Sequence, residues 1–119
     1  MVNKPTSLDC LEAALRSASF RQQAIANNIA NIDTPGYRRG VVEFEQVLAK
    51  AIQSGDPVKA LQERAQLTHP CNTPVDEMGN DVNLDMEVAN LMKNTAAQKT
   101  YLRLMAKIYT QMELVMRAE

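Results

Sequence analysis

With 119 residues and a formal net charge of −1, the chain has the size of one domain and lacks the basic excess that nucleic acid or an anionic membrane attracts. Apolar residues make up 45% of the sequence, but aromatic residues only 4% and tryptophan is absent, so the core must consist of aliphatic, methionine and alanine side chains. Because glycines and prolines are few and gather mainly in the middle, this composition favours long helices at both ends.

The sequence shows no targeting or membrane-spanning segment. Residues Met1–Asp9 lack the apolar core of a secretory signal peptide, and no run approaches the ~18 apolar residues of a membrane span. Taken alone, these features predict a cytoplasmic protein.

A first helix is predicted from about Leu8 to Asn31. Thr6, followed by Asp9 three residues later, resembles a capping box, in which side-chain oxygens accept hydrogen bonds from N–H groups at the helix start. Apolar residues then recur at alternating spacings of three and four over more than three heptads, as in a helix-packing seam. The members of this first seam are Leu8, Leu11, Leu15, Ala18, Gln22, Ile25, Ile29 and Ile32.

The first helix ends in the stretch Ala26–Tyr37, which reads Ala-Asn-Asn-Ile-Ala-Asn-Ile-Asp-Thr-Pro-Gly-Tyr. Pro35-Gly36 suits the two central positions of a type II turn, and a proline disfavours the helical conformation in the residue before it. Three asparagines precede this turn. By spacing alone they predict a solvated polar face rather than hydrogen bonds to another chain, because exposed polar residues are the ordinary case.

The middle of the chain is predicted to hold short elements and loops. Residues 41–52 predict a short helix and residues 58–67 a second, weaker one. The apolar face of the first would carry Phe44, Val47, Leu48 and Ile52. Residues 68–80, with two prolines and several polar residues, predict a loop that is our candidate for a mobile region.

The last helix is predicted from its N-cap Asn83 to about Ala118, with Asp85 and Glu87 placing negative charge at its positive end. Its apolar residues again alternate in steps of four and three. This second seam contains Leu84, Val88, Leu91, Thr95, Gln98, Leu102, Met105, Tyr109, Met112 and Met116. A parallel row widens the apolar surface of the last third beyond what one partner helix covers. That row contains Tyr101, Leu104, Ile108 and Val115.

The predicted fold class is all-α: long N- and C-terminal helices pair as a coiled-coil-like hairpin, with a short and partly irregular segment between them. We expect one domain in three parts, which are 1–36 with the first helix and the turn, 37–82 with the variable middle, and 83–119 with the last helix. Two helices packed along one seam leave apolar surface on their other sides, so we expect other chains to cover it.

The stretch Ala26–Tyr37 closely resembles the N-terminal signature of the bacterial flagellar axial proteins, which are the rod, hook and hook-associated proteins. Further segments narrow the resemblance to the flagellar basal-body rod protein family, proximal-rod protein B type. They are Leu15-Arg16, Gln22-Gln23, Arg38-Arg39, Val42-x-Phe44 and Gly79–Glu87. The resemblance covers both ends of the chain well and the middle poorly.

This resemblance implies a structural subunit of the basal-body rod, the drive shaft of the flagellum, whose terminal helices pack with those of neighbouring copies to transmit torque. It implies self-association and contacts with other rod proteins, the hook-basal-body adaptor and the flagellar export apparatus. It also implies type III export to the periplasm-spanning rod without a cleaved signal peptide. The resemblance also implies that the three asparagines before the turn form hydrogen bonds to other subunits, rather than a polar face exposed to solvent.

The residues expected at the subunit interface come from both seams, the parallel row, the asparagines and the turn. They are Leu15, Ile25, Asn27, Asn28, Ile29, Asn31, Ile32, Pro35, Gly36, Tyr37, Leu91, Leu102, Leu104, Met105, Ile108, Tyr109 and Met112.

The sequence predicts no catalytic, cofactor or metal site and no small-molecule substrate. His69 and Cys71 share a loop, but proximity in sequence does not place a base within reach of a nucleophile. No glycine-rich phosphate loop or metal-spaced cluster occurs. Two cysteines, Cys10 and Cys71, do not establish a disulfide, so their pairing stays open.

An interpretation from another class is a cytoplasmic helical adaptor or chaperone that binds a partner helix in an exposed groove. Such a protein would need the two apolar seams but not the signature with its asparagines and turn.

Overall fold

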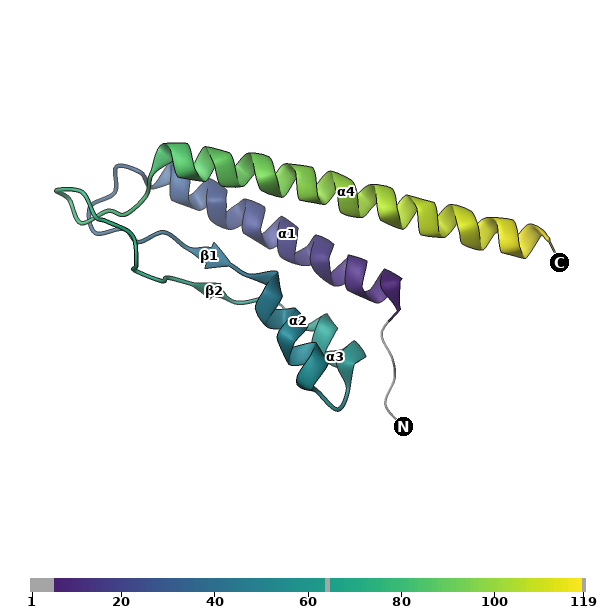
Figure 1. Cartoon of the computed structure of the whole chain (residues 1–119). Coiled ribbons are helices and arrows are strands. Elements are labelled where there is room, and N and C mark those ends of the chain that lie inside the picture. The colour runs from purple at the N-terminus through teal and green to yellow at the C-terminus, as the bar shows by residue number, and fades with distance from the viewer. Residues whose placement is uncertain (1–5, 64, 119) are drawn as a thin grey trace.

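The two terminal helices lie antiparallel along each other, and four short elements pack on another side of the first helix (Figure 1). The computed structural model describes residues 6–63 and 65–118. In chain order the elements are α1 (Ser7–Ala30), β1 (Val41–Val42), α2 (Phe44–Gln53), α3 (Pro57–Gln62), β2 (Leu67–Thr68) and α4 (Leu84–Arg117). The predicted all-α hairpin is confirmed. The structure adds a two-residue antiparallel pairing of β1 with β2, where the sequence predicted helix at the two valines.

Both long helices begin with the caps that the sequence predicts. Thr6 Oγ1 accepts a hydrogen bond from the Asp9 N–H at 3.2 Å, and Asp9 Oδ2 accepts one from the Thr6 N–H at 2.9 Å. At the start of α4, Asn83 Oδ1 accepts from the Met86 N–H at 3.2 Å. These caps satisfy N–H groups that have no partner within the helix, so each helix starts at the predicted place.

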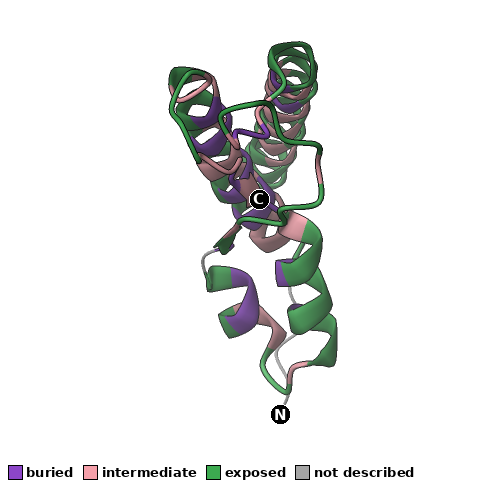
Figure 2. Cartoon of the chain, turned by 90° about the vertical axis from the view of Figure 1, so that its left-hand side faces the viewer, coloured by how far each residue is buried: buried purple, intermediate pink, exposed green. Residues whose placement is uncertain are grey.

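The core lies where α1 meets β1, α2 and α3 (Figure 2), and it is built mostly from small side chains. Its buried members are Ala13, Ala24, Val42, Val47, Ala51, Ala60, Leu61 and Ala65. The predicted apolar face of α2 is half wrong: Leu48 is exposed and Ile52 is 77% exposed. The reason is that α2 uses the stripe Phe44, Val47 and Ala51, which turns the neighbouring stripe outwards.

The face of α4 that meets α1 also differs from the predicted second seam. Its buried and half-buried residues include Glu87, Leu91, Asn94, Gln98, Tyr101, Met105 and Ile108. Six members of the predicted seam are exposed instead: Leu84, Val88, Leu102, Tyr109, Met112 and Met116. Polar side chains of α4 occupy the centre of the contact because residues of α1 satisfy them, as shown below. The predicted stripe is therefore divided: Leu91, Thr95, Gln98 and Met105 are half-buried, while its other members are exposed.

The C-terminal end of α4 projects beyond the start of α1 (Figure 1). α4 has 34 residues and α1 has 24, so α4 is longer by roughly 15 Å at 1.5 Å per residue. Every residue from Tyr109 to Ala118 is exposed. We call residues 109–118 the projecting end. None of the helices in the described ranges combines the length and apolar character that crossing a bilayer requires.

Candidate functional site

The stretch Thr34–Tyr37 forms a tight turn at the end of α1, as predicted. The Tyr37 N–H donates to the Thr34 carbonyl at 3.3 Å, and Gly36 has a φ of +72°, which suits the second central position of a type II turn. The Gly36 N–H also donates to the Met78 carbonyl at 2.8 Å. The turn is thus joined directly to the loop that precedes α4.

Asn28 lies at the centre of the site and is 0% exposed. Its Nδ2 donates to the Gly40 carbonyl at 3.0 Å and to Glu87 Oε2 at 3.2 Å. Its Oδ1 accepts from the Gly40 N–H at 2.8 Å and from the Tyr37 hydroxyl at 3.0 Å. Both amide atoms are therefore fully used within the chain, and Asn28 pairs with Gly40 as a neighbouring strand would.

Glu87, in the first turn of α4, is also 0% exposed and forms an ion pair with Arg39. The distance from Arg39 Nε to Glu87 Oε1 is 2.8 Å, and the Arg39 side chain is 13% exposed. Burial, followed by the carboxylates of Glu87 and Asp81, raises the pKa of Tyr37 above its ordinary 10.0. The hydroxyl therefore keeps its proton and donates to Asn28.

Asp81 connects these hydrogen-bonded residues to the loop before α4. Its Oδ1 accepts from the Arg39 N–H at 2.6 Å, its Oδ2 accepts from the Thr73 hydroxyl at 2.9 Å, and Arg38 Nη1 lies 3.8 Å from Oδ2. We call Asn28, Tyr37, Arg39, Asp81 and Glu87 the polar junction. It connects the end of α1, the strand-like segment after the turn and the start of α4.

Asn80 fastens the same loop to the end of α1. Its Nδ2 donates to the carbonyls of Asn31, Ile32 and Thr34 at 2.8, 3.1 and 2.9 Å. Helix ends leave carbonyl groups without partners, and here a residue about 50 positions away supplies the donor. The C-terminal end of the segment predicted to be a mobile loop is thus attached to α1 by three hydrogen bonds from one buried side chain.

Replacing Asn28 with alanine is expected to lower the free energy of unfolding by roughly 2–3 kcal/mol, because buried groups of Gly40 and Tyr37 lose their partners. Chemical denaturation of the isolated chain measures this. Asn27→Ala is the matched control, since Asn27 is exposed and precedes Asn28 directly. A change of similar size in both variants would contradict an internal role for Asn28.

The stability of the chain is expected to fall in acid through Asp81. Burial alone would raise the pKa of Asp81, but hydrogen bonds from Arg39 and Thr73 and the charge of Arg38 outweigh it and hold the pKa below 3.8. A lowered pKa stabilises the fold above the unfolded value of about 3.9, and this contribution is lost as pH falls through the folded value. The difference in unfolding free energy between the native chain and Asp81→Asn should therefore stay constant from pH 7 to about pH 5 and shrink as the pH falls below about 4. A difference that does not shrink below about pH 4 would refute this.

The structure places the predicted interface residues in three environments. Ile25 and Asn28 are buried inside the subunit, so they offer no surface to another chain; Ile25 lies in the contact of α1 with α4, and Asn28 is consumed by the polar junction. The half-buried residues are Leu15, Ile29, Asn31, Ile32, Tyr37, Leu91, Met105 and Ile108. The exposed residues are Asn27, Pro35, Gly36, Leu102, Leu104, Tyr109 and Met112.

An apolar row remains uncovered along the side of α4. We call Leu84, Val88, Leu102 and Tyr109 the apolar flank; Leu102, for example, is 53% exposed. On α1, Leu8 and Leu15 are seven residues apart, so they share one face of that helix, and both are half-buried. The apolar flank of α4 is thus left uncovered by the described segments.

The chemistry-bearing residues that the sequence singled out do not assemble. His69 Nδ1 lies 3.1 Å from the Arg38 carbonyl, Cys71 is exposed, and no hydrogen bond joins these two side chains in the described ranges. Cys10 and Cys71 are both free thiols. No group of three or more potential metal ligands is found in the part of the chain that the structure describes.

Sequence reasoning missed most of the polar junction. Arg39, Asp81 and Glu87 were noted only as members of segments that resemble a family or, for Glu87, as a favourable charge at a helix start. Their partners lie 42 to 59 residues away in the chain, and no local periodicity reports such distances. The one signal in the sequence was that two polar segments that resemble the family, Arg38-Arg39 and Gly79–Glu87, lie next to the ends of the long helices.

The fold is that of a helical structural protein, an antiparallel hairpin of two long helices that leaves a row of apolar residues exposed. Residues 8–38 match the family described as flagella basal body rod protein. The chain is 31% identical to the flagellar basal body rod protein FlgB of Bacillus subtilis (strain 168), over 71% of this chain and 72% of that one. It belongs to this family of flagellar basal body rod proteins.

Two further relatives carry the same name. The FlgB protein of Borrelia hermsii is 28% identical over 93% of this chain and 96% of its own. That of Escherichia coli (strain K12) is 44% identical over an alignment of 55 positions, and the match covers 40% of each chain. The family confirms the resemblance drawn from the signature.

Proposed function

We propose that this chain is a structural subunit of the proximal rod and packs against its neighbours through the side of the helix pair that carries the apolar flank. The observation that supports this most directly is the row of exposed apolar residues along α4, which α1 leaves uncovered. Soluble monomers rarely expose contiguous apolar patches of large size, and such patches commonly bind other proteins.

The projecting end extends this surface beyond the chain's own core. Its exposed apolar residues are Tyr109, Met112, Leu114, Val115 and Met116. They lie around much of the helix circumference, so one partner helix would not cover them all. Methionine side chains are flexible and adapt to contacts of different shape, which suits a surface that meets more than one neighbour.

The role of the assembled rod is mechanical. Packed interiors resist compression and transmit strain, so helices that interdigitate along their apolar sides are suited to carry torque. The polar junction supports this role within each subunit, because it fixes the angle at which the chain leaves α1 and enters α4. A rigid hairpin then presents its apolar side as one unit.

The partners that follow are other rod proteins and further copies of this chain. The hook-basal-body adaptor at the rod base and the flagellar export apparatus complete the proposed set. We place the protein in the periplasm-spanning rod of the basal body, after export by that apparatus without removal of a signal peptide. This role involves no catalysis.

Hydrogen exchange of the projecting end tests the proposal. In the isolated chain, amides of residues 109–117 should exchange faster than those of 87–101, because only the latter lie beside α1. In purified basal bodies the two segments should be protected alike. Mass spectrometry of both samples measures this, and a projecting end that exchanges equally fast in both would contradict the proposed packing.

A helical adaptor or chaperone would use the same apolar side to hold one partner helix. Co-purification distinguishes the two functions: a rod subunit remains with basal bodies, whereas an adaptor is recovered as a soluble one-to-one complex.

A further inference from the structure

The side of α4 that points away from α1 carries a row of cations. Residues 91–111 contain four lysine or arginine side chains and no carboxylate. Three of them, Lys99, Arg103 and Lys107, follow each other at intervals of four residues, so they lie along one side of the helix, and all three are exposed. We call them the cationic row. Arg103 is two residues from Tyr101, which is half-buried against α1, so it lies about 200° around the helix from that contact.

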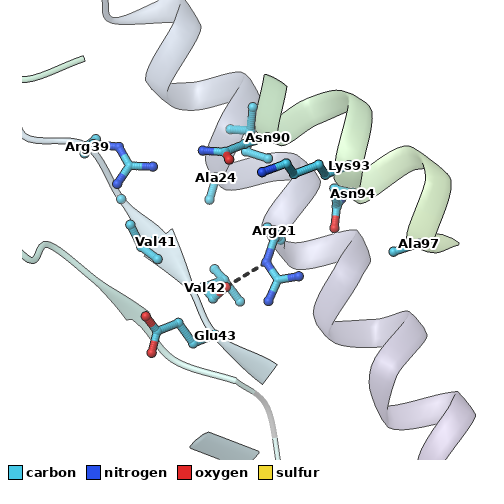
Figure 3. Close-up of a pocket in the computed structure, with 12 residues that line it drawn as sticks. Arg21, Ala24, Arg39, Val41, Val42, Glu43, Asn90, Lys93, Asn94 and Ala97 are labelled. Atoms are coloured by element: carbon cyan, nitrogen blue, oxygen red, sulfur yellow. Dashed lines mark hydrogen bonds between the residues drawn. The ribbon is translucent and has the colours of Figure 1, made fainter. Parts of the chain in front are cut away.

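The cationic row borders the apolar flank and is not neutralised within the chain. Leu102 of the flank is three residues from Lys99, which makes the two side chains neighbours on the helix surface. No member of the row forms an ion pair within residues 6–63 and 65–118. The fourth cation of the stretch, Lys93, extends over a pocket between α1, β1 and α4 (Figure 3), so it is turned toward β1 and is not part of the row.

The end of the hairpin at which α1 stops and α4 begins carries the opposite charge (Figure 1). Two segments there, 31–37 and 72–86, contain five carboxylates and no lysine, arginine or histidine. They are in direct contact, because the Gly36 N–H donates to the Met78 carbonyl at 2.8 Å. The polar junction uses Asp81, and the other four carboxylates are exposed. We call these four the acidic tip: Asp33, Asp76, Glu77 and Asp85.

The acidic tip resembles the face of α4 in its mixture of charge and apolar surface. Val75 and Met78 lie beside its carboxylates and are 46% and 45% exposed. No carboxylate of the tip forms an ion pair with another described residue. The tip and the row of one chain cannot meet, since Lys99 lies roughly 22 Å along the helix from Leu84, the first residue of α4. Both sets of charges are therefore available to another copy.

We propose that the cationic row, together with the adjoining apolar flank, binds the acidic tip of a second copy of this chain. The carboxylates of the tip pair with the cations, while Val75 and Met78 pack against Leu102. Opposite charges at an interface set the orientation and rate of association more than the affinity. The contact thus determines which end of one subunit meets which side of the next.

This contact is head-to-tail, because each copy carries one tip and one row. A head-to-tail contact that does not close into a ring continues from copy to copy and builds an open helical assembly. That the second copy is a neighbour in the rod rests on the proposed function, whereas the complementarity of the two surfaces does not.

Sedimentation equilibrium of the full, isolated chain tests the contact. Raising the ionic strength from about 0.1 M to about 1 M shortens the Debye length from about 10 Å to about 3 Å. The dissociation constant of self-association should therefore rise several-fold. A chain that does not self-associate, or whose self-association is not weakened by salt, would overturn the proposal.

Charge reversal identifies the two surfaces. Lys99→Glu and Glu77→Arg each replace an attraction with a repulsion and should raise the dissociation constant roughly tenfold. An equimolar mixture of the two variants should associate about as tightly as the native chain, because the reversed row of one meets the reversed tip of the other. A mixture that associates as weakly as each variant alone would reject the pairing of row and tip.

Lys50→Glu is the matched control. Lys50 is exposed on α2, and its reversal changes the net charge by the same amount as Lys99→Glu, so this variant should associate like the native chain. Circular dichroism checks that all variants are folded. An equal loss of association in Lys50→Glu and Lys99→Glu would show a general effect of net charge, against the proposed contact.

Recovery in purified basal bodies separates this contact from the proposed function. If the mixture fails to recover association while the native chain is found in basal bodies, the contact is rejected and the rod function stands. If the mixture recovers association but the native chain is absent from basal bodies, the contact stands and the rod function is rejected.

Discussion

Glu87→Ala is expected to lower the free energy of unfolding by about 3–5 kcal/mol, because it leaves Arg39 as a buried charge without its partner. The same change removes the acceptor of one Asn28 hydrogen bond. Such a loss is a large part of the stability of an ordinary domain, so much of the variant should be unfolded near its growth temperature. Urea denaturation followed by circular dichroism measures the effect.

The exposed pair of Glu113 and Arg117 provides the control. Its Nη2 to Oε1 distance is 2.7 Å, similar to that of the buried pair, but both side chains face solvent. Glu113→Ala should therefore cost no more than about 0.5 kcal/mol. A double variant, Arg39→Met with Glu87→Leu, should recover much of the lost stability because no unpaired charge remains. Equal effects of Glu87→Ala and Glu113→Ala would contradict the importance of burial at the polar junction.

Leu102→Glu is expected to abolish swimming while leaving the fold of the subunit unchanged. Leu102 lies on the apolar flank and is 53% exposed, so a charge there costs little in the isolated chain. In the assembled rod, the same carboxylate would be buried against an apolar neighbour without a partner. Soft-agar swimming of cells that carry the variant as their only copy measures the effect.

Thr100→Glu is the matched control for this prediction. Thr100 is exposed and two residues away, which places it about 200° around the helix from Leu102. The Thr100→Glu variant introduces the same charge on the same helix, so swimming should be preserved if the apolar flank is the surface that packs against neighbouring subunits. Loss of swimming with both variants would indicate a general effect of charge on α4.

Local rules predicted the elements of this fold well. The starts of α1 and α4 follow from the N-caps Thr6 and Asn83, and the turn after α1 follows from Pro35-Gly36. These signals depend on neighbouring residues alone, which is why one sequence suffices to find them. The short helix α3 was likewise predicted, although it ends at Gln62, before the predicted boundary.

Long-range pairing was beyond such rules. The period of apolar residues in α4 located a real stripe, but periodicity does not say which partner a stripe meets. Glu87 and Asn94 occupy the contact with α1 because Asn28, Arg39 and Ala18 satisfy them. The signature asparagine Asn28 was expected to bind another subunit, and its hydrogen bonds instead stay within the chain.

The most direct test of the central claim is the amount of this chain in basal bodies purified from cells that express Leu102→Glu or Thr100→Glu. Denaturation of the two isolated proteins in parallel measures whether each variant is folded. We predict that both variants unfold like the native chain, that Thr100→Glu is incorporated and that Leu102→Glu is missing from the rod. Normal incorporation of a folded Leu102→Glu subunit would contradict assembly through the apolar flank.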